Sequence, residues 1–372
     1  MRKHSPGNER IKHRYFVYLR EARGQSEQTI DAVARAIGRF ELHTKYRDFN
    51  AFRIEQAVAF KRSLADQISK RTGQSLSKGT QLKMLDALRD FFRWLSREPG
   101  FRSRLSYSDA DYFRLSEKDT RIARATLDKR VPSIAQISHA IKCMPSKTDI
   151  DLRDRALIAF CLLTGARNGA IASFKLKHIN VVERKLVQDA RQVKTKFSKT
   201  FTTWFFPVPD EVRQIVVDWV RFLTKEKLFG PDDPLFPATA VDCPNGEFAA
   251  VGLLRTHWSN TGPVRCVFKK AFASAGLPYA NPHSFRDTLV QLGQQLCQNP
   301  EQFKAWSQNL GHESVLTTLS SYGQVRPERQ AELIRQLATT PSNLRPANLH
   351  ELWRALQNSD LAGIGGCLPK PK

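Results

Sequence analysis

Apolar residues recur at helical spacing through the first hundred residues, and this pattern most constrains how the N-terminal third folds. We predict a helix over about residues 9–21 and a second one whose inner face carries Ile30, Val33, Ala34, Ile37 and Phe40. A third helix is predicted after the N-cap Asn50, with an inner face of Ile54, Val58, Ala65 and Ile68. The fourth ends at Pro99-Gly100, and its inner face carries Met84, Leu88, Phe91 and Leu95.

The charge of the chain points to a polyanionic partner. Its 372 residues hold 59 Lys and Arg against 36 Asp and Glu, a formal charge of +23. Residues 1–130 hold 29 of these basic residues and 16 of the acidic ones, so positive charge is densest in the helical N-terminal third. Each phosphate that such a protein neutralises releases a counterion. Nucleic acid is therefore the expected partner, and an acidic membrane surface is the alternative.

Composition argues against several other classes of protein. A chain that is 41% hydrophobic and 26% charged is globular, and its length suits two domains with cores of their own. No apolar stretch reaches the roughly 20 residues of a membrane span, and the N-terminus has no apolar signal sequence, so we expect a cytoplasmic protein. The six cysteines are scattered without a Cys-x-x-Cys pair, which argues against a disulfide scaffold or structural zinc.

The expected architecture is mainly α-helical, with two domains and a small antiparallel sheet. We predict a helical core DNA-binding domain over residues 1–100 and a polar linker over residues 101–130. A second domain spans residues 131–326 and begins at a helix capped by Ser133, with Gln136 as its capping-box partner.

Within this second domain, helices are predicted at about residues 134–143 and 151–164, and helical patterns resume from Glu211. Between them, residues 185–193 and 200–206 have the composition of β-strands, joined by a basic turn.

Short motifs in the second domain carry side chains suited to phosphate chemistry, although each motif is common by chance. Arg167 follows Thr-Gly-Ala at the end of an apolar helix. His283 and Arg286 are three residues apart, on one face of a helix that a proline begins. His312 lies in a Leu-Gly-His sequence, and Tyr322 follows ten residues later.

These residue types fit phosphodiester cleavage without a metal. Two arginines can bind the non-bridging oxygens of a phosphate through bidentate hydrogen bonds and stay charged at any working pH. Tyr322 is the candidate nucleophile; its ordinary pKa of about 10 calls for cationic surroundings and a nearby base, for which His283 and His312 are candidates. The second domain has no cluster of Asp and Glu typical of a two-metal site, so we expect no metal and no other cofactor.

In their order and spacing, the motifs resemble the tyrosine recombinase (phage integrase) family. The similarity spans the whole second domain, as its catalytic domain, and extends to the helical N-terminal third. It includes the local contexts Thr-Gly-Ala-Arg, Pro-His-Ser-Phe-Arg and Asn-Leu-Gly-His-Glu-Ser-Val-Leu-Thr-Thr. The resemblance implies a site-specific recombinase that cleaves and rejoins DNA through a 3′-phosphotyrosyl intermediate, to integrate or excise a mobile element. It also implies a homotetramer on two double-stranded DNA sites. Whether DNA-bending accessory proteins take part is left open by the sequence.

The resemblance further implies a lysine in the β-hairpin turn as the general acid for the leaving 5′-oxygen. Lys196, with a second basic residue three positions later, fits best; Lys194 is the alternative, followed by Lys199. One departure from the family is Ala170, which stands where an acidic residue often supports the site. Another is the stretch between Arg286 and His312, which is a few residues longer than usual.

The C-terminal tail, residues 327–372, is predicted to contain an amphipathic helix that docks on a neighbouring protomer or packs on its own domain. This prediction rests on the helical spacing of Leu349, Leu352, Trp353 and Leu356.

Three other functions remain open. Ala170 suggests a catalytically impaired DNA-binding protein of the same fold. A type IB topoisomerase or a telomere resolvase is a second alternative, because these enzymes use similar chemistry. The most distant alternative is a metallohydrolase built on His283, His312 and Cys297.

Overall fold

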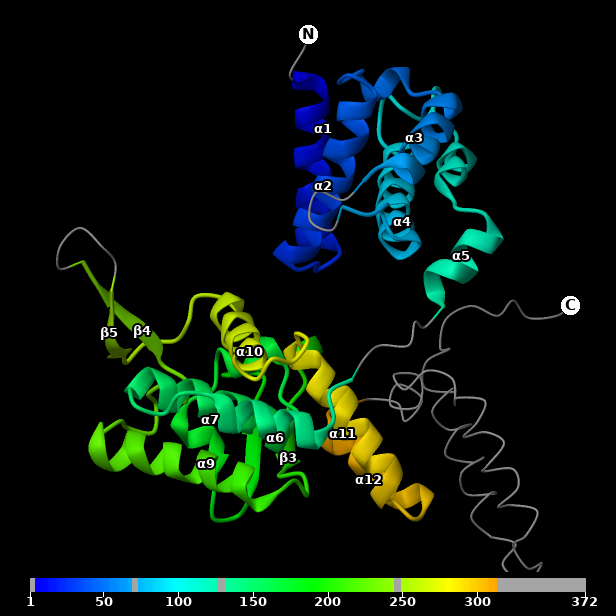
Figure 1. The fold of residues 1–372 in the computed structure, drawn as a ribbon. Coiled ribbons are helices and arrows are strands. Elements are labelled where there is room, and N and C mark those ends of the chain that lie inside the picture. The colour runs from blue at the N-terminus through cyan, green and yellow to red at the C-terminus, as the bar shows by residue number, and fades with distance from the viewer. Residues whose placement is uncertain (1–3, 69–72, 126–130, 244–248, 313–372) are drawn as a thin grey trace, which may run out of the picture. The chain divides into compact units, whose positions relative to one another are not determined.

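The computed structural model describes residues 4–68, 73–125, 131–243 and 249–312. The chain divides into two compact units, with the boundary between Thr126 and Leu127. Figure 1 shows helices throughout the N-terminal unit, whereas the C-terminal unit combines helices with short strands. Within the described ranges, no helix is both long and apolar enough to cross a membrane.

Serine caps start most helices of the N-terminal unit. Its helices are α1 (Pro6–Val17), α2 (Glu27–His43), α3 (Ile54–Asp66), α4 (Lys78–Leu95) and α5 (Glu117–Arg124), with a π-helical segment at Tyr18–Ala22 and 3-10 segments at Phe49–Ala51 and Tyr107–Phe113. A serine precedes each of α1, α2, α4 and α5. Its side chain accepts a hydrogen bond from the backbone N–H three residues later. Each cap satisfies one of the donors that a helix start leaves open.

Aromatic rings form the core of this unit. Phe40 on α2 meets Phe60, Phe92 and Phe113 edge to face, each with ring centroids 5.4 Å apart. All four side chains are at most 2% exposed, and this geometry places the positive ring edge on the negative ring face. The predicted inner faces of α2 and α4 are confirmed by the buried residues Ile30, Ile37, Leu88, Phe91 and Leu95.

The predicted start and inner face of α3 are wrong. Asn50 lies in the single turn before the helix, and Arg53 is the N-cap. The buried residues are Ala57, Phe60 and Leu64, whereas the predicted face was Ile54, Val58, Ala65 and Ile68. One ring as large as Phe60 buries more apolar surface than an alanine or valine, so it decides which side of the helix turns inward. Ile68, beyond the helix end, is 67% exposed.

The predicted linker over residues 101–130 is wrong in its first half. Phe101, Leu105, Ala110 and Phe113 are buried in the same core as the four helices. The segment therefore belongs to the N-terminal unit, because its apolar side chains close the open side of the aromatic cluster. Its polar residues had suggested a solvated linker, but they occupy only the outer face.

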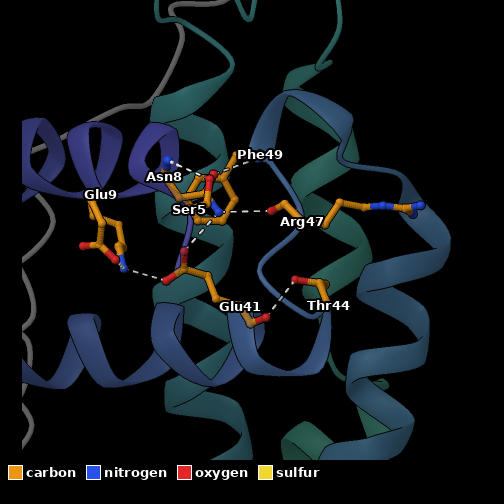
Figure 2. Close-up of polar contacts among 8 residues, drawn as sticks. Ser5, Asn8, Glu9, Glu41, Thr44, Arg47 and Phe49 are labelled. Carbon is orange, nitrogen blue, oxygen red and sulfur yellow. Dashed lines mark hydrogen bonds and ion pairs between the residues drawn. The ribbon is translucent and has the colours of Figure 1, made fainter. Parts of the chain in front are cut away.

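A buried polar network fixes α1 to the chain between α2 and α3 (Figure 2). The Asn8 side chain is fully buried; its Nδ2 donates to Glu41 Oε1 and to the carbonyl of Arg47, both at 3.0 Å. Its Oδ1 accepts a 3.0 Å bond from the Phe49 backbone N–H. Lys12 Nζ lies 2.6 Å from the other carboxylate oxygen of Glu41, which is 1% exposed. Each polar group of this contact is thus paired, as burial requires.

We predict that Asn8→Ala lowers the free energy of unfolding by about 2–3 kcal/mol, because it leaves buried partners of the amide without hydrogen bonds. Urea unfolding of the full chain measures this change. Arg47→Ala is the matched control, since only the backbone carbonyl of Arg47 takes part in the contact. The control should change stability by less than about 0.5 kcal/mol. Equal losses in the two variants would contradict the assigned role of Asn8.

The C-terminal unit is built around one apolar helix. Its helices are α6 (Ile134–Cys143), α7 (Asp149–Thr164), α8 (Asn168–Ile171), α9 (Asp210–Arg221), α10 (Gly262–Ser274), α11 (Pro282–Leu296) and α12 (Pro300–Asn309). Every residue from Ala156 to Thr164 is buried, because α7 packs against α6, α9, α10 and α11 (Figure 1). A helix apolar on all sides must lie inside its domain. The predicted capping box of Ser133 and Gln136 is present at the start of α6.

The sheet of this unit is small and antiparallel, as predicted. Strands β1 (Ile179–Asn180), β2 (Lys185–Gln188) and β3 (Phe201–Trp204) pair in the order β1-β2-β3. Both predicted strands exist, but β2 ends earlier than expected. Asp189 turns the chain there, since its carbonyl accepts hydrogen bonds from the N–H groups of Gln192 and Val193. The basic turn therefore lies at the end of a long loop between β2 and β3.

A second hairpin, β4 (Ala238–Asp242) and β5 (Ala249–Leu254), was not predicted. Its residues do not alternate between apolar and polar types, so the sequence lacks the pattern of a half-buried strand. Buried Arg153 on α7 holds its base, donating to the carbonyl of Pro237 at 3.0 Å and to Thr239 Oγ1 at 2.9 Å.

Candidate active site

Arg286 is the centre of the candidate site and is 4% exposed. Asn281 caps α11 and Pro282 begins it, so Arg286 lies just beyond the first turn and faces the interior. Its Nη2 donates to the carbonyl of Leu310 at 2.6 Å and lies 2.8 Å from His312 Nε2. Its Nη1 donates to the carbonyl of Gly165. One guanidinium thus joins the C-terminal ends of α7 and α12 to the start of α11.

Arg167 reaches the same place from the end of α7. Its Nη2 donates to the carbonyl of Gly311 at 3.5 Å. The chain turns towards this position at Gly165, whose φ of 59° is left-handed. A Cβ on Gly165 would lie 2.9 Å from a methyl of Leu310 and 3.0 Å from one of Leu289, so only glycine fits. Arg167, Arg286 and His312 are therefore brought together, as the sequence predicted.

Cations and burial together set the electrostatics of the site. Burial and then the charges of Arg286 and Arg167 lower the pKa of His312 to about 3, with smaller contributions from His283 and Lys196. Burial and the charge of Arg167 likewise lower the pKa of Arg286 to about 9. Both shifts favour loss of positive charge, and an anion bound between these groups would reverse them.

Arg286 makes no ion pair with a carboxylate anywhere in the described ranges, and its buried Nε has no hydrogen-bond partner there. Its other donors meet only carbonyl oxygens and an imidazole. The charges that act on Arg286 are those of Arg167 and Asp287. A buried guanidinium whose donors meet neutral acceptors can also attract an anion such as phosphate.

The structure separates the three candidate lysines of the β2–β3 loop. The charge of Lys196 is the smallest of the causes that lower the pKa of His312. The charge of Lys194 acts instead on His257, whose pKa is lowered chiefly by burial. Nothing comparable links Lys199 to the site.

His283 is exposed in the first turn of α11, where its backbone N–H donates to Asn281 Oδ1 at 2.9 Å. Its charge also lowers the pKa of His312, so the two imidazoles are neighbours. The candidate nucleophile Tyr322 and the predicted tail helix lie outside the described residues.

Two positioning residues were missed by the sequence reasoning. Ser173 Oγ accepts a 2.9 Å bond from the backbone N–H of Lys194 and donates to the carbonyl of Ala170 at 2.9 Å. It thereby ties the lysine loop to the segment that carries Arg167. Ala170 itself is buried, and its methyl group cannot replace the carboxylate that the resemblance leads us to expect at this position.

Asn309, the second missed residue, joins β3 to the segment that carries His312. Its Nδ2 donates to the carbonyl of Trp204 at 2.9 Å, and its Oδ1 accepts the Trp204 N–H at 2.7 Å. The ring of Phe201 then covers Gly311, where an added Cβ would come within 2.5 Å of it. The asparagine before Leu-Gly-His was visible in the sequence, but its partner on β3 was not.

No group of three or more His, Cys, Asp and Glu side chains that could hold a metal ion occurs among the described residues. In particular, His283, His312 and Cys297 do not form one, so the metallohydrolase alternative has no support from the site.

Comparison with protein families agrees with this geometry. Residues 124–329 match the phage integrase family, and residues 13–99 match the phage integrase N-terminal SAM-like domain. The chain belongs to the phage integrase family. It is a tyrosine site-specific recombinase, an enzyme that binds DNA and breaks and rejoins its strands. No curated protein matches the sequence.

Solved structures with a similar fold are also recombinases. A lambda integrase (75–356) dimer bound to a COC′ core site has a TM-score of 0.58 at 16% identity, covering 86% of this chain and 96% of that one. XerH site-specific recombinase bound to palindromic difH has a TM-score of 0.56 at 16% identity, with coverages of 87% and 84%. Tn1549 transposon integrase in complex with transposon right-end DNA has a TM-score of 0.52 at 16% identity, covering 88% of this chain and 99% of that one. The predicted fold class is thereby confirmed.

The lowered pKa of His312 predicts how acid destabilises the protein. The unfolded imidazole takes up a proton below about pH 6.5, whereas the folded one does so only near pH 3. The unfolded state therefore binds more protons in this window, and stability falls as the pH falls through it. Gln cannot titrate and its carbonyl can still accept from Arg286. We expect His312→Gln to remove about 1–2 kcal/mol of the acid-induced loss between pH 7 and pH 4.5, since solvent contact screens part of the shift.

Urea unfolding of both proteins at these two pH values measures the difference. Titration of every other group cancels between wild type and variant. The same loss of stability in both would show that the His312 imidazole is not held neutral by its surroundings.

Proposed function

We propose that Arg167 and Arg286 hold the scissile phosphate of a double-stranded DNA site while Tyr322 attacks it. The observation that carries this proposal is the convergence of Arg167 and Arg286 on the carbonyls of residues 165, 310 and 311, with His312 in contact with Arg286. The attack forms a 3′-phosphotyrosyl bond and releases a 5′-hydroxyl.

Preorganised charge explains how this site lowers the barrier. The transition state of phosphoryl transfer carries extra negative charge on the non-bridging oxygens, and guanidinium groups fixed beforehand stabilise it without reorganising. Because Arg286 is already dehydrated by burial, its hydrogen bonds to phosphate gain strength from the low local dielectric. An Arg286→Lys variant keeps the charge but loses the fork of donors, so it would not replace the arginine.

The two histidines are proposed to supply a further hydrogen bond to the phosphate and a base for the nucleophile. Because Arg286 has no acceptor, its 2.8 Å contact assigns Nε2 of His312 as acceptor and leaves the ring proton on Nδ1. His312 is then a neutral hydrogen-bond donor through Nδ1. We propose that His312 contacts a non-bridging oxygen through this donor and that His283 takes up the proton of Tyr322.

Lys196 is the proposed general acid that protonates the leaving 5′-oxygen. The 5′-hydroxyl of a partner strand then attacks the phosphotyrosine and reverses the step. The covalent bond conserves the energy of the phosphodiester, so the reaction as proposed requires no ATP.

The proposed partners follow from charge and from the related structures. The N-terminal unit would position duplex DNA through phosphate contacts, with steep salt dependence. A lambda integrase tetramer bound to a Holliday junction has a TM-score of 0.54 with this fold. We propose a homotetramer on two DNA sites, which integrates or excises a mobile element in the cytoplasm with the help of DNA-bending proteins. The tail over residues 327–372 would dock on a neighbouring protomer.

The nucleophile is tested with a nicked suicide substrate that carries an end of the element encoding the protein. Wild type should give a protein–DNA adduct that survives denaturant, and Tyr322→Phe should give none, because phenylalanine has no nucleophilic oxygen. An adduct in the variant would overturn the assignment of Tyr322. DNA binding without any wild-type adduct would favour the impaired protein suggested by Ala170. Relaxed circles or hairpin ends as final products would favour a topoisomerase or resolvase.

The general acid is tested with a second substrate, in which sulfur replaces the bridging 5′-oxygen. A thiolate leaves without a proton, since the pKa of a thiol is only about 8.5. Lys196→Ala should slow single-turnover cleavage of the oxygen substrate about 100-fold or more and leave the sulfur substrate nearly unaffected. Lys194→Ala and Lys199→Ala, the matched controls, should change both rates less than about tenfold. If Lys194→Ala or Lys199→Ala instead cleaves only the sulfur substrate at the wild-type rate, that lysine is the general acid.

A further inference from the structure

Phe197, at the end of the β2–β3 loop, combines two unusual features. Its side chain is 77% exposed, and its backbone has φ 60° and ψ 26°. Ser198 follows with φ 50°. A bulky residue in the left-handed region is an outlier, since its Cβ approaches the neighbouring carbonyl. Such strain persists only where the surrounding structure maintains it, and it concentrates at functional sites.

The exposed ring of Phe197 contacts the side chain of Lys196. The ammonium of Lys196 lies over the face of Phe197, 4.7 Å from the ring centroid. This distance is within the range of a cation–π interaction, in which the negative ring face attracts the cation. A lysine side chain on an exposed loop otherwise samples many rotamers, so the ring narrows the positions that its ammonium can take.

The loop around this pair is fixed to the walls of the phosphate site at both ends. Before it, the N–H of Lys194 donates to Ser173 Oγ at 2.9 Å. After it, Thr200 Oγ1 accepts the Ala190 N–H at 3.0 Å, and the ring of Phe201 covers Gly311. The tip that carries Lys196 and Phe197 is therefore held between anchored residues, and the charge of Lys196 acts on His312.

We propose that Phe197 is a positioning residue that holds the Lys196 ammonium for proton transfer to the leaving 5′-oxygen. This inference rests on the proposed role of Lys196 as general acid. The ring itself takes no proton and touches no reacting atom. It acts by keeping the acid near the bond that breaks, where a small displacement of a catalytic group costs much of the rate.

The test compares oxygen and 5′-sulfur substrates in single-turnover cleavage by the full chain. Phe197→Ala should slow cleavage of the oxygen substrate about tenfold and of the sulfur substrate less than about twofold, because only the former needs the acid. Phe197→Tyr keeps the ring face and should behave as wild type. Phe197→Leu keeps apolar bulk without that face and should resemble the alanine variant.

Two further variants separate the ring from the backbone. Phe197→Gly relieves the left-handed strain but also removes the ring, so we expect the same defect as in Phe197→Ala. Leu228, elsewhere in the C-terminal unit, is the matched control: it is 71% exposed with a φ of 54°. Leu228→Ala should leave both cleavage rates unchanged. A defect in Phe197→Ala that glycine repairs would overturn the inference in favour of a purely conformational role.

Other outcomes also overturn it. Equal slowing of both substrates, or weaker DNA binding with unchanged cleavage rates, would make Phe197 a structural or DNA-contacting residue. In a Lys196→Ala background, loss of Phe197 should have no additional effect on the oxygen substrate, and an additional tenfold loss would contradict action through Lys196. Failure of the proposed function itself looks different: wild type would then form no adduct with either substrate, or Lys196→Ala would not be rescued by sulfur.

Discussion

The buried guanidinium of Arg286 is the interaction on which the active site depends. It donates to the carbonyls of Gly165 and Leu310, which are 121 and 24 residues away along the chain, and it contacts His312. Carbonyls at helix ends are the natural partners of a buried cation, because they are left without intrahelical donors and carry partial negative charge. The same contacts that fix the ends of α7 and α12 therefore aim the remaining donors at a bound anion.

Burial and like charge at the site favour the binding of an anion, as the proposed function requires. Burial and mutual repulsion lower the pKa values of His312 and Arg286 in the protein without DNA. A phosphate placed among these groups removes the repulsion and supplies the missing acceptors. The repulsion between the cationic groups is thus relieved most strongly in the transition state, where the negative charge on the phosphate is greatest. In the proposed function, phosphate recognition and catalysis therefore share one physical cause.

Local sequence rules predicted much of the fold. The Ser133 capping box, the start of α11 at Pro282 and the inner faces of α2 and α4 follow from interactions within one or two turns of a helix. Predictions failed where distant packing decides. Phe60 turned α3 by filling the aromatic core, and Phe101 and Phe113 drew a polar segment into it. The β4–β5 hairpin has no alternating pattern and is held at its base by Arg153, a contact between distant parts of the chain.

The sequence by itself determined which residue types the site contains and their order along the chain, because an arginine, a His-x-x-Arg pair and a Leu-Gly-His turn are readable as local motifs. Only the tertiary structure decided how they meet. It showed that the charge of Lys196 acts on His312, and it revealed the contacts that Ser173, Asn309 and Phe197 make around these residues. The reason is physical: each of these placements depends on hydrogen bonds, charge or ring contacts set by three-dimensional packing, which no spacing in the sequence encodes.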